Sequence, residues 1–205
     1  EKIKKYITDP LDADVFFSGG CNTFGVDQNE ELLKSLFNNQ DRMGLKLYCI
    51  QPSPIPLKLS IKFTFSVKQK KSYNHIYFEN NILQMWQNWY ICDQLVQQWE
   101  IEHNFKYDLI LRIRCDMFIF RSFTDGELLD AENMLIIPYE LNFREWHYLS
   151  RSDQYVLGSG NNIHKVNELF LYYNDLCSQL DYLHPESLYG TYIEKYLNLD
   201  VKECE

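Results

Sequence analysis

The stretch from Tyr107 to Phe120 (YDLILRIRCDMFIF) constrains the fold more than any other part of the sequence. It is almost continuously apolar, which predicts a central strand that is covered on both faces. Side chains alternate between faces along a strand, so Arg112, Arg114 and Asp116 share one face. Charged groups on a buried strand are costly unless they pair with each other or bind a ligand. The stretch therefore predicts either an internal Arg–Asp network or a site for an anionic ligand.

The remaining pattern predicts one α/β domain over residues 1–205. Strands that alternate with helices favour a mostly parallel central sheet with helices on both faces, in which the 107–120 strand pairs in parallel with the first two strands. The expected strands are Asp14–Ser18, Lys46–Ile50, Tyr107–Phe120, Met134–Tyr139 and Ser152–Ser159. The expected helices are Glu1–Thr8, Asn29–Asn39, Ile82–His103, a helix from Asn161 or Asn162 to about Leu180, and Pro185–Leu197.

Proline and asparagine mark several boundaries of these elements. Pro10 is expected to stop the first helix, and Asn104 to end the helix that begins at Ile82, whose apolar residues recur every three or four positions. Pro185 fits the first turn of the last helix. Three alternating prolines at positions 52, 54 and 56 exclude a helix or central strand there, so the region up to about residue 81 is expected to be irregular.

Charge and cysteine usage exclude several classes of protein. The formal charge of −9 disfavours nucleic acid as a partner, because an acidic surface repels a phosphate backbone. The six cysteines are scattered without a CxxC pair, which favours reduced, buried thiols over a disulfide scaffold or a zinc site. No apolar run reaches the ~18 residues of a membrane span. These features predict a soluble cytoplasmic protein, and the start at Glu1 instead of Met favours one module of a longer protein.

The charged face of the 107–120 strand predicts a phosphate site. In open parallel sheets the ligand crevice lies beyond the carboxyl ends of the strands, where Arg112, Arg114 and Asp116 are expected. Guanidinium groups match phosphate oxygens, and a carboxylate beside a diphosphate is a natural Mg²⁺ or Mn²⁺ ligand.

Several segments of the chain carry a family resemblance in the same order. They are Ala13–Phe16 (ADVF), Tyr107–Asp116 (YDLILRIRCD), Ser152–Ser159 (SDQYVLGS) and His184–Glu186 (HPE), with a Trp- and Cys-bearing helix before the second. The sequence resembles nucleotide-sugar glycosyltransferases with a GT-A-type fold, as found in large DNA viruses and bacterial polysaccharide clusters. It departs from them in lacking their first strand and the first acid of their Asp-x-Asp motif.

The resemblance implies a site and a reaction. The donor is a nucleotide-diphosphate sugar, with UDP-sugar favoured over GDP-sugar, and the acceptor is a glycan or glycoprotein. Transfer is expected to invert configuration, and a viral enzyme would act in the host cytoplasm. Asp116 would bind Mn²⁺ or Mg²⁺, Asp153 would be the base and Glu186 a second acid. The implied donor-binding residues are Asp14, Ser18, Gly19, Arg112 and Arg114.

Alternatives to this assignment remain open at the level of sequence. Asp153 could be a cap, Glu186 could stabilise the start of a helix, and His147 and His184 are more often structural. Trp146 and Tyr148 could stack on a sugar or anchor a loop. The whole chain could also be a non-catalytic nucleotide-sugar or carbohydrate binding module, a structural domain, or a metal-dependent phosphoesterase, for which the clustered ligands are too few.

Overall fold

The computed structural model describes residues 4–20, 45–51, 75–114, 120–139, 150–179 and 184–204. These residues divide between two compact units, each with its own strands and its own packed side chains. The long helix α4 (His75–His103) contributes to both, because the division falls after Gln87. The first unit holds the N-terminal elements, and the second holds the residues from Tyr107 to Arg114 and from Asp125 onward.

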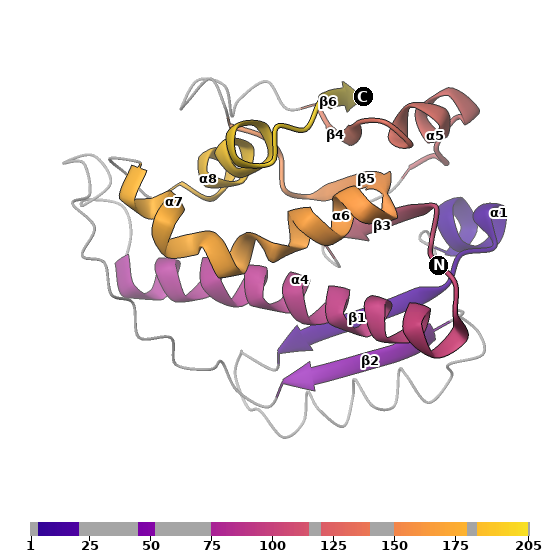
Figure 1. Cartoon of the computed structure of the whole chain (residues 1–205), viewed down its shortest axis with the longest axis horizontal. Coiled ribbons are helices and arrows are strands. Elements are labelled where there is room, and N and C mark those ends of the chain that lie inside the picture. The colour runs from indigo at the N-terminus through magenta and orange to yellow at the C-terminus, as the bar shows by residue number, and fades with distance from the viewer. Residues whose placement is uncertain are drawn as a thin grey trace. The chain divides into compact units, whose positions relative to one another are not determined.

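The first unit contains a pair of parallel strands. A π-helical turn η1 (Lys4–Thr8) and a short helix α1 (Asp9–Leu11) lead into β1 (Val15–Gly20), which pairs with β2 (Leu45–Gln51). Figure 1 shows the two strands as parallel arrows. The ring of Phe16 on β1 meets the ring of Trp99 on α4 edge to face, with 6.4 Å between centroids.

The second unit is built on a four-stranded mixed sheet with the strand order β3-β5-β4-β6. Both pairs that include β5 are antiparallel, and only β4 and β6 run parallel. The central strand β4 is the most apolar, and its first three residues are fully buried. The bounds of these strands are β3 (Leu109–Ile113), β4 (Leu135–Pro138), β5 (Tyr155–Ser159) and β6 (Val201–Cys204).

Helices of the second unit supply the rest of its core. Gly160 opens the first helix after β5, and its amide donates to the Asp108 carbonyl, so the chain turns tightly against the start of β3. The helical segments are α5 (Asp125–Ala131), α6 (Gly160–Asn167), the 3₁₀ turn η4 (Glu168–Tyr172), α7 (Tyr173–Gln179), α8 (Pro185–Thr191) and the π-helical turn η5 (Tyr192–Tyr196). Side chains with no exposed surface include Trp86, Leu135, Ile136, Ile137, Ile163, Leu169, Leu176, Leu188, Tyr189 and Tyr192.

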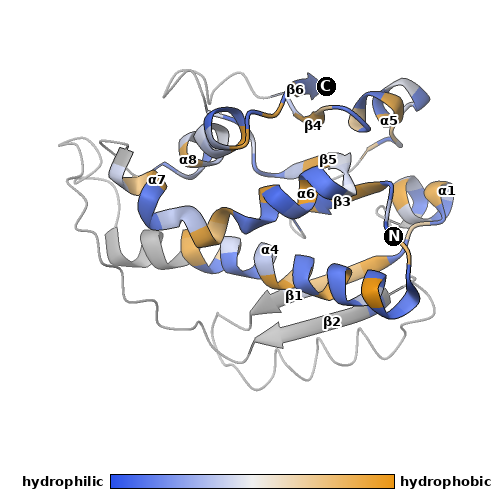
Figure 2. Cartoon of the chain, in the orientation of Figure 1, coloured by the Kyte–Doolittle hydropathy of each residue, from blue (hydrophilic) through white to orange (hydrophobic). Residues whose placement is uncertain are grey.

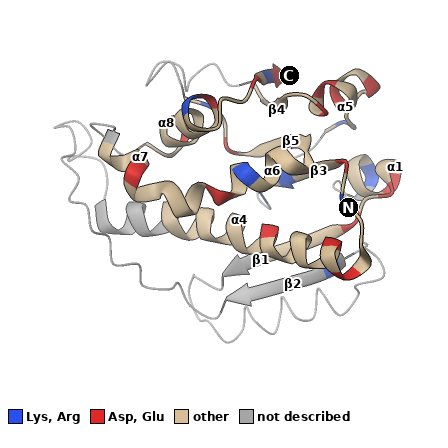
Figure 3. Ribbon diagram, in the orientation of Figure 1, with Lys and Arg blue, Asp and Glu red and all other residues tan. Residues whose placement is uncertain are grey.

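The distribution of polar residues agrees with this packing. Figure 2 shows much of β5 in hydrophobic or neutral colours, whereas α6 turns a hydrophilic side toward the viewer. Figure 3 shows few charges along α4 and several acidic residues on α5. Among the described helices, none is both long and apolar enough to cross a membrane. Of the described cysteines, Cys177 is buried, and Cys92, Cys177 and Cys204 form no disulfide with one another.

Most of the predicted elements that fall on described residues are confirmed. The strands predicted at 14–18, 46–50, 134–139 and 152–159 appear as β1, β2, β4 and β5, and α4 covers the predicted helix. Asn104 follows that helix with a left-handed φ of 55°, as expected of a residue that ends a helix. Pro185 lies in the first turn of α8. The helix predicted at 29–39 lies outside the described residues.

The predicted mostly parallel sheet is not confirmed, although the α/β class is. Within the described residues β3 has an antiparallel partner, β5, in place of the parallel partners expected from the first half of the chain. An apolar run alone does not decide the direction of pairing. The expectation of a central strand covered on both faces is also not met, because β3 is at one end of the strand order of the described four-stranded sheet and its five residues are half-buried. Residues 115–119, which the predicted strand included, lie outside the described residues.

Smaller corrections concern helix boundaries. Pro10 does not end the helical structure, because it lies inside α1. It is in the first turn of that helix, where a backbone amide hydrogen would have no partner within the helix, so the hydrogen that proline lacks is not needed. The cap of α6 is Ser159 and not Asn161 or Asn162. Helix α4 begins at His75, so residues 75–81 are helical where an irregular region was expected. Helix α5 and strand β6 were not predicted.

Candidate functional site

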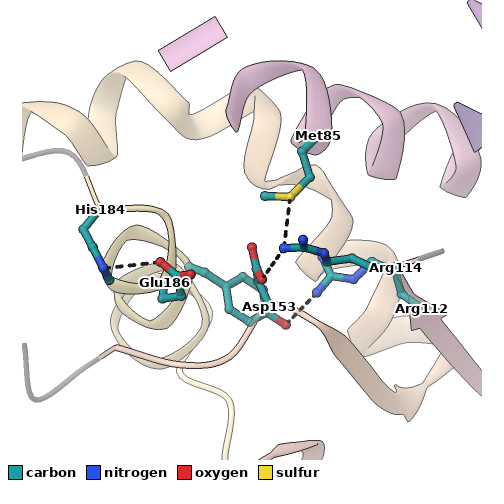
Figure 4. Close-up of polar contacts among 7 residues, drawn as sticks. Met85, Arg112, Arg114, Asp153, His184 and Glu186 are labelled. Carbon is teal, nitrogen blue, oxygen red and sulfur yellow. Dashed lines mark hydrogen bonds and ion pairs between the residues drawn. The ribbon is translucent and has the colours of Figure 1, made fainter. Parts of the chain in front are cut away.

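Three of the predicted site residues come together in the second unit. Arg112 lies on β3 and Arg114 follows it, while Asp153 precedes β5. The antiparallel pairing of these strands continues past β3, because the Arg114 amide donates to the Gln154 carbonyl at 3.0 Å. Arg114 Nη1 reaches Asp153 Oδ1 at 3.2 Å (Figure 4). The strand register therefore places one of the two arginines directly at the carboxylate that the sequence suggested as the base.

Burial of this ion pair is unequal. The Asp153 side chain is 3% exposed, and the Arg114 side chain is 34% exposed. Burial raises the pKa of Asp153 above the usual carboxyl range, although Arg114 and Arg112 favour the ionised form. Burial likewise lowers the pKa of Arg112, against the attraction of Tyr189 and Asp153. The carboxylate is thus held inside the protein, and the guanidinium of Arg114 is the member of the pair that reaches solvent.

The two arginines are fixed by different neighbours. Arg112 Nη2 donates to the phenolic oxygen of Tyr189 on α8 at 3.1 Å, and its guanidinium carbon lies 5.1 Å from the Tyr189 ring centroid. Arg114 Nη1 also contacts the sulfur of Met85 on α4 at 4.0 Å. Figure 4 shows both guanidinium groups beside Asp153. Two cations and one anion meet here, so the cluster carries excess positive charge that a phosphate could balance.

The start of α8 is tied to the segment that carries Asp153. The Arg151 amide donates to the Glu186 carbonyl at 3.0 Å, and the buried hydroxyls of Ser150 and Ser187 lie 2.7 Å apart. The Glu186 carboxylate lies 3.4 Å from His184 Nδ1, which also contacts the Ser187 hydroxyl at 3.1 Å. Glu186, predicted as a second acid, is therefore joined to the Asp153 segment through the backbone and to His184 through its side chain.

The other predicted donor-binding residues belong to the first unit. Asp14 lies just before β1 and forms an ion pair with Lys46 Nζ at 3.0 Å. Lys46 Nζ also lies 5.8 Å from the Trp99 ring centroid. Ser18 and Gly19 lie on β1, opposite Cys49 and Ile50 in the parallel register. This unit also has an open hollow of about 410 Å³ on the α4 surface, lined by Gln94, Gln97, Gln98, Ile101 and Glu102. None of those lining residues was predicted as part of a site.

The predicted metal ligand cannot be compared with the structure. Asp116 lies outside the described residues, as do Trp146, His147 and Tyr148. Among the residues that are described, no group of three or more His, Cys, Asp or Glu side chains could hold a metal ion.

Sequence reasoning missed Tyr189 and Met85. Tyr189 lies 77 residues from Arg112 along the chain and Met85 lies 29 residues from Arg114, so neither belongs to a local motif. A signal for Tyr189 was present, since a tyrosine on an apolar helix face needs a partner for its hydroxyl when it is buried. That signal indicates a polar partner but does not name it.

Comparisons with known proteins give no relative for this chain: no family model, no curated protein and no solved structure matches it. The function therefore has to be argued from the residues and the site.

Proposed function

We propose that this chain is a glycosyltransferase that moves a sugar from a nucleotide-diphosphate donor to a glycan acceptor. A UDP-sugar is the favoured donor. The observation that carries the proposal is the cluster of Arg112, Arg114 and Asp153, in which the one-third exposed side chain of Arg114 borders a buried carboxylate. The proposal includes a GT-A-like fold, for which the parallel β1–β2 pair is the supporting feature.

The arginine pair supports binding of the donor diphosphate. The guanidinium of Arg114 is one-third exposed and can turn toward an incoming anion, while Arg112 is held by Tyr189. A guanidinium forms two parallel hydrogen bonds with phosphate oxygens and stays charged at any pH in the physiological range. In the reaction these donors would stabilise the negative charge that grows on the leaving nucleotide diphosphate.

Asp153 is proposed as the base. When the acceptor oxygen bonds to the anomeric carbon, the bond from that carbon to the donor phosphate breaks, and its electron pair leaves with the nucleotide diphosphate. The acceptor hydroxyl proton passes to the Asp153 carboxylate. The raised pKa of Asp153 favours this transfer, because a base works best with a pKa near the working pH. A diphosphate that draws Arg114 away would uncover the carboxylate.

A second candidate function follows from the burial of the Asp153 side chain. Because the Asp153 side chain is only 3% exposed, it can serve to hold Arg114 in place without meeting an acceptor. The chain would then be a non-catalytic nucleotide-sugar binding module. In both cases Arg114 binds phosphate, so the two candidates differ only in the role of Asp153.

A metal ion is part of the proposed enzyme but is not needed for the argument. Mn²⁺ or Mg²⁺ at Asp116 would supply further neutralisation of the diphosphate. Among the described residues, no group of three or more His, Cys, Asp or Glu side chains could hold this ion.

Calorimetric titration with UDP tests the proposal. Arg114→Ala is expected to weaken binding by about 10- to 100-fold, which corresponds to the loss of a charged hydrogen bond. Arg121→Ala, which changes an exposed arginine in the first unit, is the matched control and should bind like the wild type. Failure of the wild type to bind UDP, GDP or any other nucleoside diphosphate would exclude both candidate functions.

Asp153→Asn separates the enzyme from the binding module. The amide keeps the shape of the side chain but cannot accept a proton. In the enzyme, this variant binds the donor but loses sugar transfer, measured with a panel of nucleotide sugars and acceptors with and without Mn²⁺. Transfer that survives in Asp153→Asn would show that Asp153 is not the base.

A further inference from the structure

Helix α8 contacts both sides of the charged cluster. Its Tyr189 hydroxyl accepts a hydrogen bond from Arg112 of β3, and its Ser187 hydroxyl lies 2.7 Å from Ser150, three residues before Asp153. In addition, the Glu186 carbonyl accepts a hydrogen bond from the Arg151 amide. One short helix thus bonds to Arg112 on β3 and to the segment that carries the carboxylate.

Tyr189 is suited to orient a charged group. Its side chain has no exposed surface, and Leu188 and Tyr192, which are near it in the sequence, are fully buried as well. A phenol held in this way cannot follow a moving guanidinium. The ring lies 5.1 Å from the Arg112 guanidinium carbon, so the same side chain offers a cation–π contact in addition to its hydroxyl.

The two arginines therefore differ in freedom. Arg112 is anchored at a rigid, buried partner, whereas Arg114 is anchored at Asp153 and is one-third exposed. Adjacent guanidinium groups repel each other, and without a fixed partner Arg112 would move away from Arg114. An anion that needs both groups at once gains affinity when one of them is already in position, because less motion has to be frozen on binding.

We propose that Tyr189 is a positioning residue for the anion site, and that it holds the Arg112 guanidinium next to Arg114 so that both face one diphosphate. This inference rests on the proposed function, since it specifies how the diphosphate site is held ready. Tyr189 itself does not touch the ligand. Its hydroxyl, and not only its ring, is the part that acts.

Tyr192 provides a matched control. It lies three residues after Tyr189, is also fully buried, and also makes one hydroxyl bond, which it donates to the Lys165 carbonyl at 2.9 Å. Tyr189→Phe and Tyr192→Phe each remove one buried oxygen. General loosening of the unit would therefore affect both variants alike, and only the proposed role separates them.

The first experiment measures binding of UDP and of inorganic pyrophosphate to the full chain by calorimetry. Tyr189→Phe is expected to weaken both ligands by about tenfold, and Tyr192→Phe by less than about twofold. In an Arg112→Lys background, Tyr189→Phe should add little, because it acts through the guanidinium that is already lost. Equal losses in both tyrosine variants, no loss in Tyr189→Phe, or a full additional loss in the Arg112→Lys background would each overturn the inference.

A second measurement does not depend on any ligand. Nitrogen-15 NMR of the arginine side chains, with Arg112 assigned by its disappearance in Arg112→Lys, reports how freely that guanidinium rotates. Its Nη signals should broaden or merge in Tyr189→Phe and stay separate in Tyr192→Phe. Unchanged signals in Tyr189→Phe would overturn the positioning role. A wild type that shows the restrained Arg112 but binds neither UDP nor pyrophosphate would refute the proposed function and leave the restraint itself established.

Discussion

The two units of the molecule each hold an aspartate–cation pair at a predicted site residue, and the two pairs differ in burial. Asp14 pairs with Lys46 at 3.0 Å, and both side chains are about equally open to solvent, at 27% and 35%. Asp153 pairs with Arg114 at 3.2 Å, but the carboxylate is only 3% exposed. The distances are similar, so the contrast lies in the surroundings and not in the contact.

The difference teaches which pair can matter for function. Exposed ion pairs are screened by water and contribute ~0–1 kcal/mol, so Asp14 and Lys46 add little beyond local order. A buried carboxylate beside two arginines gives up its hydration. Removal of either the carboxylate or the arginines would leave an uncompensated charge. Such a site is costly to keep, which is why it points to a ligand more strongly than the exposed pair does.

Removal of the buried carboxylate is expected to have the largest effect. Asp153→Ala should lower the free energy of unfolding by about 3 kcal/mol, the low end for a broken buried pair because Arg114 is one-third exposed. The loss arises because Arg112 and Arg114 then repel each other without a counter-charge. Urea denaturation measures it.

Asp14→Ala is the comparison for that experiment. It removes the same side chain from the exposed pair and should cost less than about 1 kcal/mol. If the two aspartate variants lose equal stability, burial does not distinguish the pairs and the contrast between the units fails.

A substitution at Gly160, in the turn from β5 into α6, should have the next largest effect. A Cβ at Gly160 would lie 2.4 Å from the Tyr107 carbonyl oxygen, so the turn from β5 into α6 has to move away from β3. Gly160→Ala is expected to cost about 2 kcal/mol, typical of overpacking against a rigid neighbour. Because Arg114 directly follows β3 and Asp153 precedes β5, affinity for UDP should fall as well.

Gly126→Ala is the control for that variant, since Gly126 is exposed on α5 in the same unit. It should leave both stability and UDP binding near the wild-type values. Stability that is unaffected by Gly160→Ala would mean that the β5–α6 turn can relax without moving the charged cluster.

The sequence predicted part of the buried cluster, and the limits of the prediction have physical causes. Period-two alternation predicted that Arg112 and Arg114 share one face, and both guanidinium groups lie beside Asp153 (Figure 4). The role of Asp153 as the base stays a prediction. For β3 the expected parallel partners are not confirmed, because an apolar run does not record the direction in which a strand pairs. The run also suggested a central strand covered on both faces, whereas β3 is the first strand in the order of the described four-stranded sheet and its residues are half-buried. The partner Tyr189 was missed because its contact with Arg112 spans 77 residues, which no local pattern records.

Other elements were missed because their sequences are weak signals. Strand β6 (VKEC) is short and carries two charges, and its identity as a strand depends on its parallel pairing with β4. Helix α5 (DGELLDA) contains a glycine in its first turn, which lowers helix propensity. In both cases tertiary contacts decide the structure, and local preference does not.

The pH dependence of stability offers a smaller but more specific test. The pKa of Asp153 is raised on folding, so its carboxyl group binds a proton more tightly in the native state than in the unfolded state. Its contribution to stability is therefore fully present below the unfolded-state pKa of 3.8. That contribution is lost as the pH rises through the folded-state pKa. The stability advantage of the wild type over Asp153→Asn should therefore shrink as pH is raised from 4 toward 7. Tyr192→Phe, which changes no group that titrates in this range, should show a constant difference. An advantage that grows with pH would mean that the arginines outweigh burial and lower the pKa of Asp153.

Salt should produce the smallest effect and should act on only one of the two pairs. At about 1 M salt the screening length falls to ~3 Å, which weakens interactions between exposed charges far more than interactions between buried ones. The stability lost in Asp14→Ala, measured by urea denaturation, should then approach zero, because both side chains of this pair are about one-third exposed. The loss in Asp153→Ala should persist, since few ions reach a carboxylate that is 3% exposed. If salt reduces both losses equally, solvent enters the Arg114–Asp153 cluster freely. Burial would then not hold the cluster ready for a phosphate.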